Sequence, residues 1–303
     1  MGRHGRSQMS RRTLLLVALA LCAASALGVA GCGNGDEGDG GTVEPTSEPT
    51  ATTSPAPTEE PSGETVTVLV YFLSGEKLAT AERTLPATQA VARAAMDALC
   101  GGPNDYEQAA GLTSSVPEGT TVLGITIVDG TATVDLSGEY ASGGGSLSMM
   151  SRVAQVVYTL TQFKSIRAVL FHLDGEPVEA LGGEGIIVDS PQRRAAWQDF
   201  EPVIFVERPG VGATIASPVV ISGRASVFEA TIQLEVLNAD EKPLAKGFTM
   251  ATIGAPDRGR FRERLAYAAS ATTEGFVVAY ETSMQDGSRL HEVRVPVFFA
   301  PAQ

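Results

Sequence analysis

Two carboxylates that lie close together are the first candidates for chemistry in this sequence. Asp135 closes an extended run of residues, and Glu139 follows four positions later. Most glycan hydrolases place two carboxyl groups on either side of the bond they cleave, so the pair suggests hydrolysis of a cell-wall glycan. The structural alternative is that Asp135 and Ser137-Gly138 form a turn that ends a strand. Acidic chains often bring carboxylates together by chance, so we favour the turn.

The other chemistry-bearing residues are scattered. Beyond residue 31 the histidines are His172 and His291, which have neither His-x-x-x-His nor Cys-x-x-Cys spacing, so we predict no metal and no cofactor. The serines near residues 143–146 lack the Gly-x-Ser-x-Gly elbow of a serine hydrolase. The glycine run Gly143-Gly144-Gly145 suggests either an anion site at a helix N-terminus or simply a flexible loop. We therefore predict no catalytic residue and no enzymatic activity.

Cys32 is the residue with the clearest chemical context. It ends Val29-Ala30-Gly31-Cys32, which follows an apolar run over residues 14–29. Small residues before a cysteine resemble the lipobox of bacterial lipoproteins, whose thiol is diacylated before cleavage in front of it. The apolar run is shorter than the ~20 residues that a spanning helix needs. We therefore predict a lipoprotein signal peptide over residues 1–31 and lipid attachment at Cys32, on the extracytoplasmic face of the bacterial cell membrane.

Two alternatives concern this signal. The first is that the signal is an ordinary cleaved one, with a coincidental cysteine, or an uncleaved anchor helix. The second concerns the export route, because Ser10-Arg11-Arg12-Thr13-Leu14-Leu15 resembles a twin-arginine signal, although Leu14 stands where an aromatic residue is more usual. General secretion and twin-arginine export both remain open.

Cys100 is the only cysteine left for the mature protein, because Cys22 lies in the signal and Cys32 carries the lipid. No intramolecular disulfide is then possible. Cys100 follows Leu99 at the end of a helical pattern, and no His or Lys lies close in sequence. We expect it to be a small buried apolar side chain.

Residues 32–63 are predicted to be a disordered acidic tether. Gly, Thr, Pro and Ser dominate this segment, which cannot form a hydrophobic core, and its composition also suits O-glycosylation. Its acidic residues are Asp36, Glu37, Asp39, Glu44, Glu48, Glu59 and Glu60. The whole chain has a net charge of -13, and removing the four arginines before Cys32 gives about -17. This charge argues against binding nucleic acid and against docking of the protein surface on anionic lipid.

Residues 64–196 are predicted to form an α+β domain with the order β-β-α-β-β-α-β, in which two helices pack on one mixed sheet. The first helix begins near Thr88, and Asp129-Gly130 between alternating strands indicates a type I′ hairpin. A second turn is expected at Asp174-Gly175. The strands are expected at residues 65–72, 78–85, 121–128, 131–136 and 166–173, and the second helix carries an apolar stripe at Met149, Val153, Val156, Leu160 and Phe163.

Residues 197–303 have an all-β pattern that predicts a separate immunoglobulin-like sandwich of about seven strands. Four strand candidates lie at residues 219–221, 232–236, 276–280 and 293–297. The aromatic residues Phe228, Phe248, Tyr267 and Tyr280 are expected mostly in the core. The segment around Phe228 is the exception, because it lies between strands and is expected to be exposed.

Both regions resemble known domains. The first resembles the GerM-type domain of sporulation and spore germination, and the second is similar to the immunoglobulin-like domain that accompanies it in germination proteins. The first likeness is carried by residues 99–103, 111–114, 116–120, 154–163 and 173–175, and the second by Ser217-Pro218-Val219, Gly223, Val227-Phe228-Glu229-Ala230, Arg258-Gly259, Phe261 and Val295-Pro296-Val297.

The resemblance implies a cell-envelope protein and no known reaction. GerM-type domains are similar to ring-building domains that oligomerise in sporulation channels, and related lipoproteins occur in actinobacteria that form no spores. We therefore predict a nonenzymatic lipoprotein that binds envelope proteins or self-associates. The alternative is a protein that binds or hydrolyses peptidoglycan.

Overall fold

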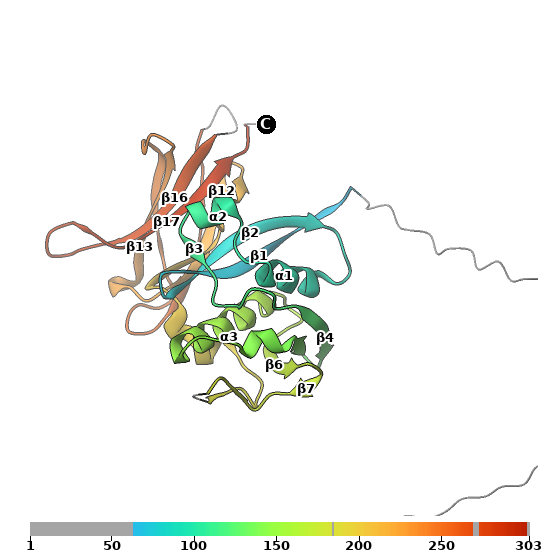
Figure 1. The fold of residues 1–303 in the computed structure, drawn as a ribbon. Helices are drawn as coiled ribbons and strands as arrows, with labels where there is room; N and C mark the ends of the chain where they lie inside the picture. The colour runs from blue at the N-terminus through green and yellow to red at the C-terminus, as the bar shows by residue number, and fades with distance from the viewer. Residues whose placement is uncertain (1–62, 184, 269–272, 302–303) are drawn as a thin grey trace, which may run out of the picture. The chain divides into compact units, whose positions relative to one another are not determined.

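A computed structural model describes residues 63–183, 185–268 and 273–301, and these residues belong to one compact unit (Figure 1). The predicted signal peptide, the lipid site at Cys32 and nearly all of the predicted tether lie outside the described residues. Among the residues described, no helix has the length and apolar character needed to cross a membrane.

The N-terminal part of this unit mixes helices and strands, as expected. Its strands are β1 (Thr65–Ser74), β2 (Lys77–Pro86), β3 (Leu112–Thr113), β4 (Val122–Val128), β5 (Thr131–Leu136), β6 (Ala168–Leu173), β7 (Glu176–Pro177), β8 (Ala180–Leu181) and β9 (Ile186–Ile187). Its helices are α1 (Val91–Cys100), α2 (Asp105–Ala109) and α3 (Ser146–Leu160), with 3-10 turns η1 (Gly138–Ala141) and η2 (Arg194–Phe200). The elements predicted from periodicity are all present, and the predicted α+β class is confirmed.

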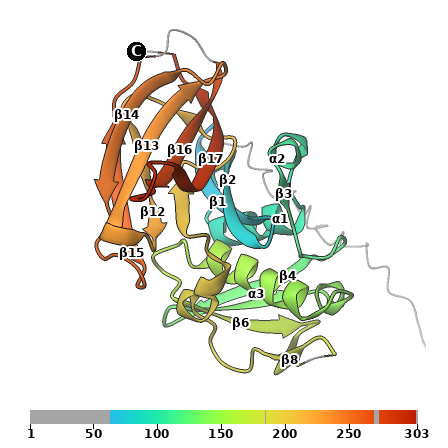
Figure 2. The ribbon, with the colours of Figure 1, turned by 90° about the vertical axis from the view of Figure 1, so that its left-hand side faces the viewer.

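Strand β1 is the most deeply buried element of this part. Residues 68–73 are all buried, so both faces of the strand are covered. Helices α1 and α3 pack against β1, while β10 packs against its neighbour β2. Figure 2 shows β1 and β2 between helix α3 and the strands of the C-terminal part. A strand covered on both faces explains the almost continuous run of β-branched and aromatic residues in its sequence.

The sequence predicts one sheet here, and that detail is wrong. The strands form two sheets, in the orders β2-β1-β3 and β4-β5-β6-β7, with β8 and β9 as a separate pair. Helix α3 and the turn that follows it replace the missing strand along one edge of β1. The side chains of Gln155, Thr159 and Gln162 bond to the backbone of Leu69 and Tyr71 at 2.6–3.2 Å. The polar groups of this edge are satisfied without another strand.

Both predicted Asp-Gly turns have the expected geometry. Asp129 and Gly130 have φ values of 50° and 82°, and Asp174 and Gly175 have φ values of 49° and 88°. Two consecutive residues with positive φ define the type I′ turn, which matches the twist of antiparallel strands. These aspartates therefore serve the turns that join β4 to β5 and β6 to β7.

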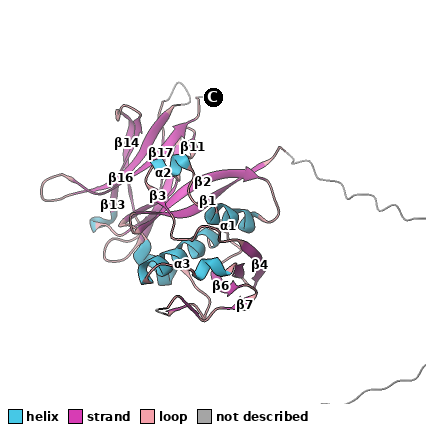
Figure 3. Ribbon diagram, in the orientation of Figure 1, coloured by secondary structure: helices cyan, strands magenta, loops and turns pink. Residues whose placement is uncertain are grey.

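The C-terminal part is an all-β sandwich of two sheets, with the orders β10-β12-β15 and β11-β17-β16-β13-β14 (Figure 3). Its strands are β10 (Ile204–Arg208), β11 (Thr214–Ile215), β12 (Val219–Ala225), β13 (Thr231–Asn238), β14 (Pro243–Met250), β15 (Gly259–Leu265), β16 (Glu274–Thr282) and β17 (Arg289–Phe299), with the 3-10 turn η3 (Phe228–Ala230) before β13. The core between the sheets includes Ile221, Ile232, Leu234, Val277 and Phe299, all fully buried.

The aromatic residues of the sandwich follow the prediction only in part. Tyr267 is buried and its hydroxyl donates to the carbonyl oxygen of Ile215 at 2.8 Å. Phe228 is exposed, as expected. The predicted burial of Phe248 is wrong, since this residue is 64% exposed. Phe248 pairs with Gln233 on the outer face of edge strand β14, where no further layer covers it.

Candidate functional site

The candidate carboxylate pair is built into a turn. Asp135 Oδ1 accepts a hydrogen bond from the backbone N–H of Gly175 at 3.0 Å, and Asp174 Oδ1 accepts one from Gly138 at 3.2 Å. Glu139 is exposed, and a hydrogen bond from Ser137 lowers its pKa. A general acid needs a raised pKa, which burial supplies in glycan hydrolases. The arrangement therefore supports the structural interpretation of Asp135.

The two histidines lie in different parts of the unit, and each has one carboxylate near it: Asp135 on β5 is the register partner of His172 on β6, and Glu281 lies near His291. His172 is half-buried on β6, and His291 is exposed on β17 with its Nε2 atom 3.8 Å from a carboxylate oxygen of Glu281. Within the described part of the chain, no group of three His, Cys, Asp or Glu residues is placed to hold a metal ion. The absence of a cofactor stays a prediction.

The glycine run before α3 contacts a buried cation. Arg152 on α3 is only 2% exposed, and its guanidinium donates to the carbonyl oxygens of Tyr140, Ser142 and Gly143. The loop therefore directs carbonyl groups at an arginine. Of the two alternatives left by the sequence, this geometry favours a structural loop, because the loop presents carbonyl oxygens, which bind the arginine and would repel an anion.

Cys100 has the character of a structural thiol. It is the last residue of α1, is partly buried and packs against the core. Burial, with a further contribution from Asp97, raises the pKa of Cys100 to about 11. The nucleophilic thiolate is therefore scarce at neutral pH.

A partly buried polar network joins the two parts of the unit around Arg194 at the start of η2. Its guanidinium donates to Glu207 Oε1 at 2.6 Å, to Tyr71 Oη at 3.0 Å and to Thr161 Oγ1 at 2.8 Å. The Tyr71 hydroxyl in turn donates to Glu207 Oε1 at 2.6 Å. Burial opposes the charge on Arg194, but the neighbouring Tyr71 and Glu207 outweigh it and raise its pKa.

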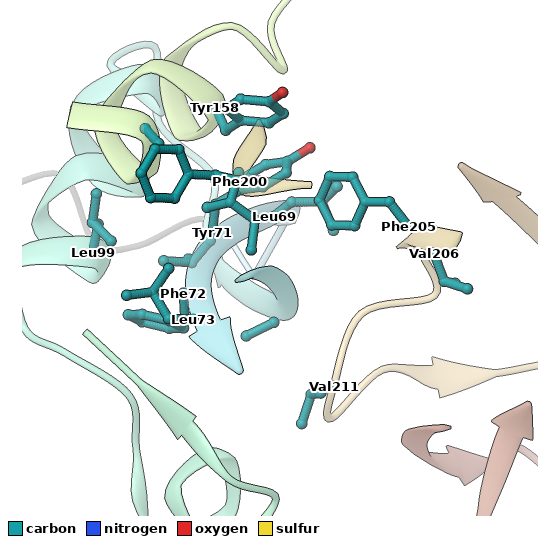
Figure 4. Packing of buried hydrophobic residues seen from close by; sticks show 14 of the residues in the cluster. Leu69, Tyr71, Phe72, Leu73, Leu99, Tyr158, Phe200, Phe205, Val206 and Val211 are labelled. Atoms are coloured by element: carbon teal, nitrogen blue, oxygen red, sulfur yellow. The ribbon is translucent and has the colours of Figure 1, made fainter. Parts of the chain in front are cut away.

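Tyrosine rings fill the space beside this network. Tyr71 and Tyr158 lie 5.5 Å apart, and Phe205 of β10 lies 6.1 and 6.2 Å from them, as centroid distances (Figure 4). The Arg194 guanidinium lies 4.6 Å from the centroid of the Tyr158 ring. Burial raises the pKa of both tyrosines, and the nearby Glu207 and Glu201 carboxylates raise it further. Both hydroxyls therefore stay protonated as hydrogen-bond donors.

Glu201 is the centre of a second buried cluster at the same junction. One carboxylate oxygen accepts from the Tyr158 hydroxyl at 2.5 Å and from Arg224 at 2.8 Å. Arg258 approaches the other oxygen at 3.1 Å. The Glu201 side chain is completely buried, so the two arginines neutralise a carboxylate that water cannot reach.

The backbone strengthens this junction. The N–H of Val211 donates to the carbonyl oxygen of Thr80 at 2.8 Å, and the N–H of Glu82 donates to that of Val211 at 3.0 Å. Gly210 makes this approach possible, because a Cβ atom there would lie 2.8 Å from the backbone nitrogen of Glu82. Strand β2 and the segment after β10 are therefore in direct contact.

An open groove lies beside the junction and is lined from both parts. A cavity of about 620 Å³ is bordered by Arg194, Arg224, Arg260 and Arg262, together with Glu207 and Met250. A second cavity of about 310 Å³ shares Arg194, Glu207 and Arg260 and adds Tyr71, Gln162 and Arg208. Together these cavities form one surface, which we call the arginine groove.

The outer face of the five-stranded sheet carries an exposed apolar patch. Phe248 and Met250 on β14 pair with Gln233 and Thr231 on β13, so they share that face. Phe228 and Met284 border a small hollow of about 140 Å³ that also includes Thr231 and Gln233. The four apolar side chains, 61–79% exposed, are Phe228, Phe248, Met250 and Met284. We call this surface the apolar face.

Comparison with known protein families gives one match for each of the two parts of the unit. Residues 69–179 match the Germane family, described as sporulation and spore germination. Residues 203–288 match the Gmad2 family, described as the immunoglobulin-like domain of bacterial spore germination. The chain carries a Germane domain followed by a Gmad2 domain. The predicted recognition is confirmed for these two domains. Their association with sporulation and germination is established at the level of the families.

Three solved structures are similar to the chain. The first GerMN domain of the sporulation protein GerM from Bacillus subtilis is 27% identical, covering 43% of this chain and 98% of that one, with a TM-score of 0.37. The tandem GerMN domains of the same protein are 18% identical, covering 79% and 62%, with a TM-score of 0.40. A putative lipoprotein from Clostridium perfringens is 21% identical, covering 45% and 93%, with a TM-score of 0.34. No curated protein matches the chain.

The junction lies partly outside both family matches. Arg194 and Glu201 fall between residue 179, where the Germane match ends, and residue 203, where the Gmad2 match begins. Sequence reasoning also missed these residues, because their partners on β1, α3, β10 and β12 are distant in the chain. The only sequence signal was a break in periodicity around residues 190–200.

Proposed function

We propose that the protein is a nonenzymatic, lipid-anchored protein of the cell envelope that binds a protein partner through the apolar face of its Gmad2 domain. The observation that carries this proposal is that Phe248 and Met250 on one sheet face and Phe228 and Met284 in the loops beside it are each more than 60% exposed. Contiguous exposed apolar residues on a soluble domain mark sites of protein interaction.

The surroundings of the apolar face fit a protein interface. Beside it on the same sheet, Glu235 receives hydrogen bonds from Tyr280 at 3.2 Å and from Arg289 at 2.8 Å. Lys246 lies 3.0 Å from the same carboxylate. An apolar centre next to polar groups is the usual anatomy of a protein–protein interface.

We take the partner to be a different protein. The chain has a net charge of -13, so two copies of it carry charge of the same sign and repel each other on close approach. Self-association through the apolar face is the other outcome of the test.

The lipid anchor at Cys32 belongs to the same proposal. Replacing Cys32 with Ser should move the protein from the membrane fraction to the soluble or secreted fraction.

The partner test uses two matched double variants. Phe228→Ser with Met284→Ser removes two exposed apolar side chains from the apolar face. Val128→Ser with Ile187→Ser removes two that are each 62% exposed in the N-terminal part of the unit. Chemical crosslinking in the host, followed by purification, should give a crosslinked species that the first variant loses and the second retains. Equal crosslinking by all three proteins would overturn the proposal. A concentration-dependent dimer, abolished only by the first variant, would replace the partner with a second copy.

The nonenzymatic part has its own test. The purified protein is incubated with cell-wall sacculi, and soluble fragments are measured. We expect none, because Asp135 is held in a turn and Glu139 is exposed with a lowered pKa. Release of fragments that Asp135→Ala or Glu139→Ala abolishes would contradict the nonenzymatic assignment.

A further inference from the structure

The arginine groove has a charge opposite to that of the protein. The chain carries a net charge of -13, yet five arginines and one carboxylate, Glu207, line this groove. The arginines are Arg194, Arg208, Arg224, Arg260 and Arg262. Such a concentration of one sign in an oppositely charged protein favours an anionic ligand.

Three of these arginines are already neutralised within the fold. Arg194 pairs with Glu207 at 2.6 Å, Arg208 with Glu82 at 3.3 Å and Arg224 with Glu201 at 2.8 Å. Arg260 and Arg262 make no ion pair within the described part of the chain. The same holds for Arg264, two residues further along β15. These three exposed arginines, which no carboxylate neutralises within the described structure, give this surface its excess of positive charge.

The strand geometry spaces these cations regularly. Gly259 and Phe261 face the core of the sandwich, so Arg260, Arg262 and Arg264 project from the opposite face of β15. Alternate residues of a strand lie about 7 Å apart on one face. On the neighbouring strand, Arg224 and Ser222 pair with Arg260 and Arg262. The result is a row of three arginines along one face of β15, with Arg224 and Ser222 beside it on β12.

We propose that the arginine groove, whose lining is locally positive despite the net charge of the chain, binds an extended polymer other than a nucleic acid that carries phosphate groups at regular intervals. Guanidinium groups recognise phosphate through two parallel hydrogen bonds. The Ser222 and Thr252 hydroxyls in the lining add donors of the kind that contact phosphate oxygens in nucleic-acid complexes. The free arginines of β15 match a ligand whose charge repeats along its length.

The groove is less suited to an acidic peptide. An extended peptide gains affinity by pairing with an open strand edge. Strand β15 is at the edge of its sheet, but the edge is already occupied at Arg260. The Thr252 backbone N–H donates to the Arg260 carbonyl oxygen at 2.9 Å, and the Thr252 hydroxyl accepts from the Arg260 N–H at 3.0 Å. Of the apolar residues in the lining, Phe261 is buried and Met250 belongs to the exposed apolar face. Charge is therefore the main recognition element of the groove.

The test measures binding of inorganic polyphosphate and poly(glycerol phosphate) by the full chain in neutral detergent at about 0.1 M salt. The test variant is Arg260→Gln with Arg262→Gln. The matched control, Lys164→Gln with Lys242→Gln, removes the same charge from two exposed positions outside the groove lining. We expect the test variant to bind on the order of tenfold more weakly and with a shallower salt dependence, and the control to change less than twofold.

Several outcomes would overturn this inference. Failure of the unaltered protein to bind either phosphate polymer is the first. Equal weakening by the two variants would indicate diffuse charge attraction. Binding of polyglutamate as tight as that of polyphosphate would indicate an acidic-peptide site, and binding only to vesicles of anionic phospholipid would indicate a lipid surface. The outcome is independent of the partner test, because Phe228 and Met284 lie outside the groove lining.

Discussion

The junction and the arginine groove use the same residue type in opposite ways. At the junction, Arg194 and Arg224 are mostly buried, and each bonds to a carboxylate. On β15, the strand next to β12, Arg260 and Arg262 are exposed and form no ion pair within the described structure. An arginine that meets a buried carboxylate contributes to the fold, whereas one facing solvent without a partner is available for a ligand. The two groups should therefore respond differently to substitution.

The largest effect is expected at Glu201. Glu201→Ala leaves Arg224 and Arg258 without their buried counter-charge, and breaking such a pair costs about 3–5 kcal/mol. Chemical denaturation should show this loss of stability. Glu292→Ala is the control, because its pairs with Arg289 and Arg294 are at the surface and should contribute less than about 1 kcal/mol. Equal losses for the two variants would remove the distinction between junction and surface.

Tyr71→Phe should have the next largest effect. It deletes a hydroxyl that donates to Glu207 and accepts from Arg194, and a hydrogen bond to a charged group contributes about 1.5–3 kcal/mol. The same denaturation experiment measures the loss in the free energy of unfolding. A loss below about 0.5 kcal/mol would show that the hydroxyl does not hold the junction together.

A pH dependence follows from the same tyrosines. Burial raises the pKa of Tyr71, Tyr140 and Tyr158 above the ordinary value of 10.0. The folded state therefore favours the neutral form, so this stability is complete below pH 10 and is lost as the pH rises above it. The Tm, measured between pH 8 and 11, should fall as the pH rises. The double variant Tyr71→Phe with Tyr158→Phe should reduce the slope of Tm against pH, and an unchanged slope would contradict this assignment.

A substitution at Gly210 tests how closely the Germane and Gmad2 domains approach each other. In Gly210→Ala the new Cβ atom meets the backbone of Glu82, and overpacking of this kind costs about 1–3 kcal/mol. Gly183→Ala is the control, because a Cβ atom there meets nothing within 4 Å. If the two variants have the same Tm, the contact between β2 and the segment after β10 is not tight in solution.

The smallest effect on stability is expected on β15. Arg260→Gln with Arg262→Gln removes exposed side chains that lack ion pairs, so the free energy of unfolding should change by no more than about 0.5 kcal/mol. Denaturation of the variant used for the polyphosphate measurement checks this. A larger loss would mean that these arginines serve the fold, as those of the junction do.

The sequence predicted the local elements well, because they depend on local patterns. Alternation in β13, the apolar stripe of α3 and the two Asp-Gly turns each lie within a few residues. The sheet order was not predictable in the same way, since Gln155, Thr159 and Gln162 replace a strand beside β1 from a helix distant in the chain. The binding surfaces were missed for the same reason. The arginine groove combines Arg194 and Arg208 with β15, and the apolar face depends on which side of edge strand β14 is covered.

The central claim is that the Germane and Gmad2 domains unfold as one unit held by the buried junction. The only tryptophan, Trp197, lies in η2 at this junction and is 8% exposed. Equilibrium unfolding can therefore be followed at the junction by tryptophan fluorescence and throughout the protein by far-ultraviolet circular dichroism. We predict a single transition with the same midpoint in both signals. A fluorescence transition at a lower denaturant concentration than the circular dichroism transition would show that the junction opens first, and would contradict the claim.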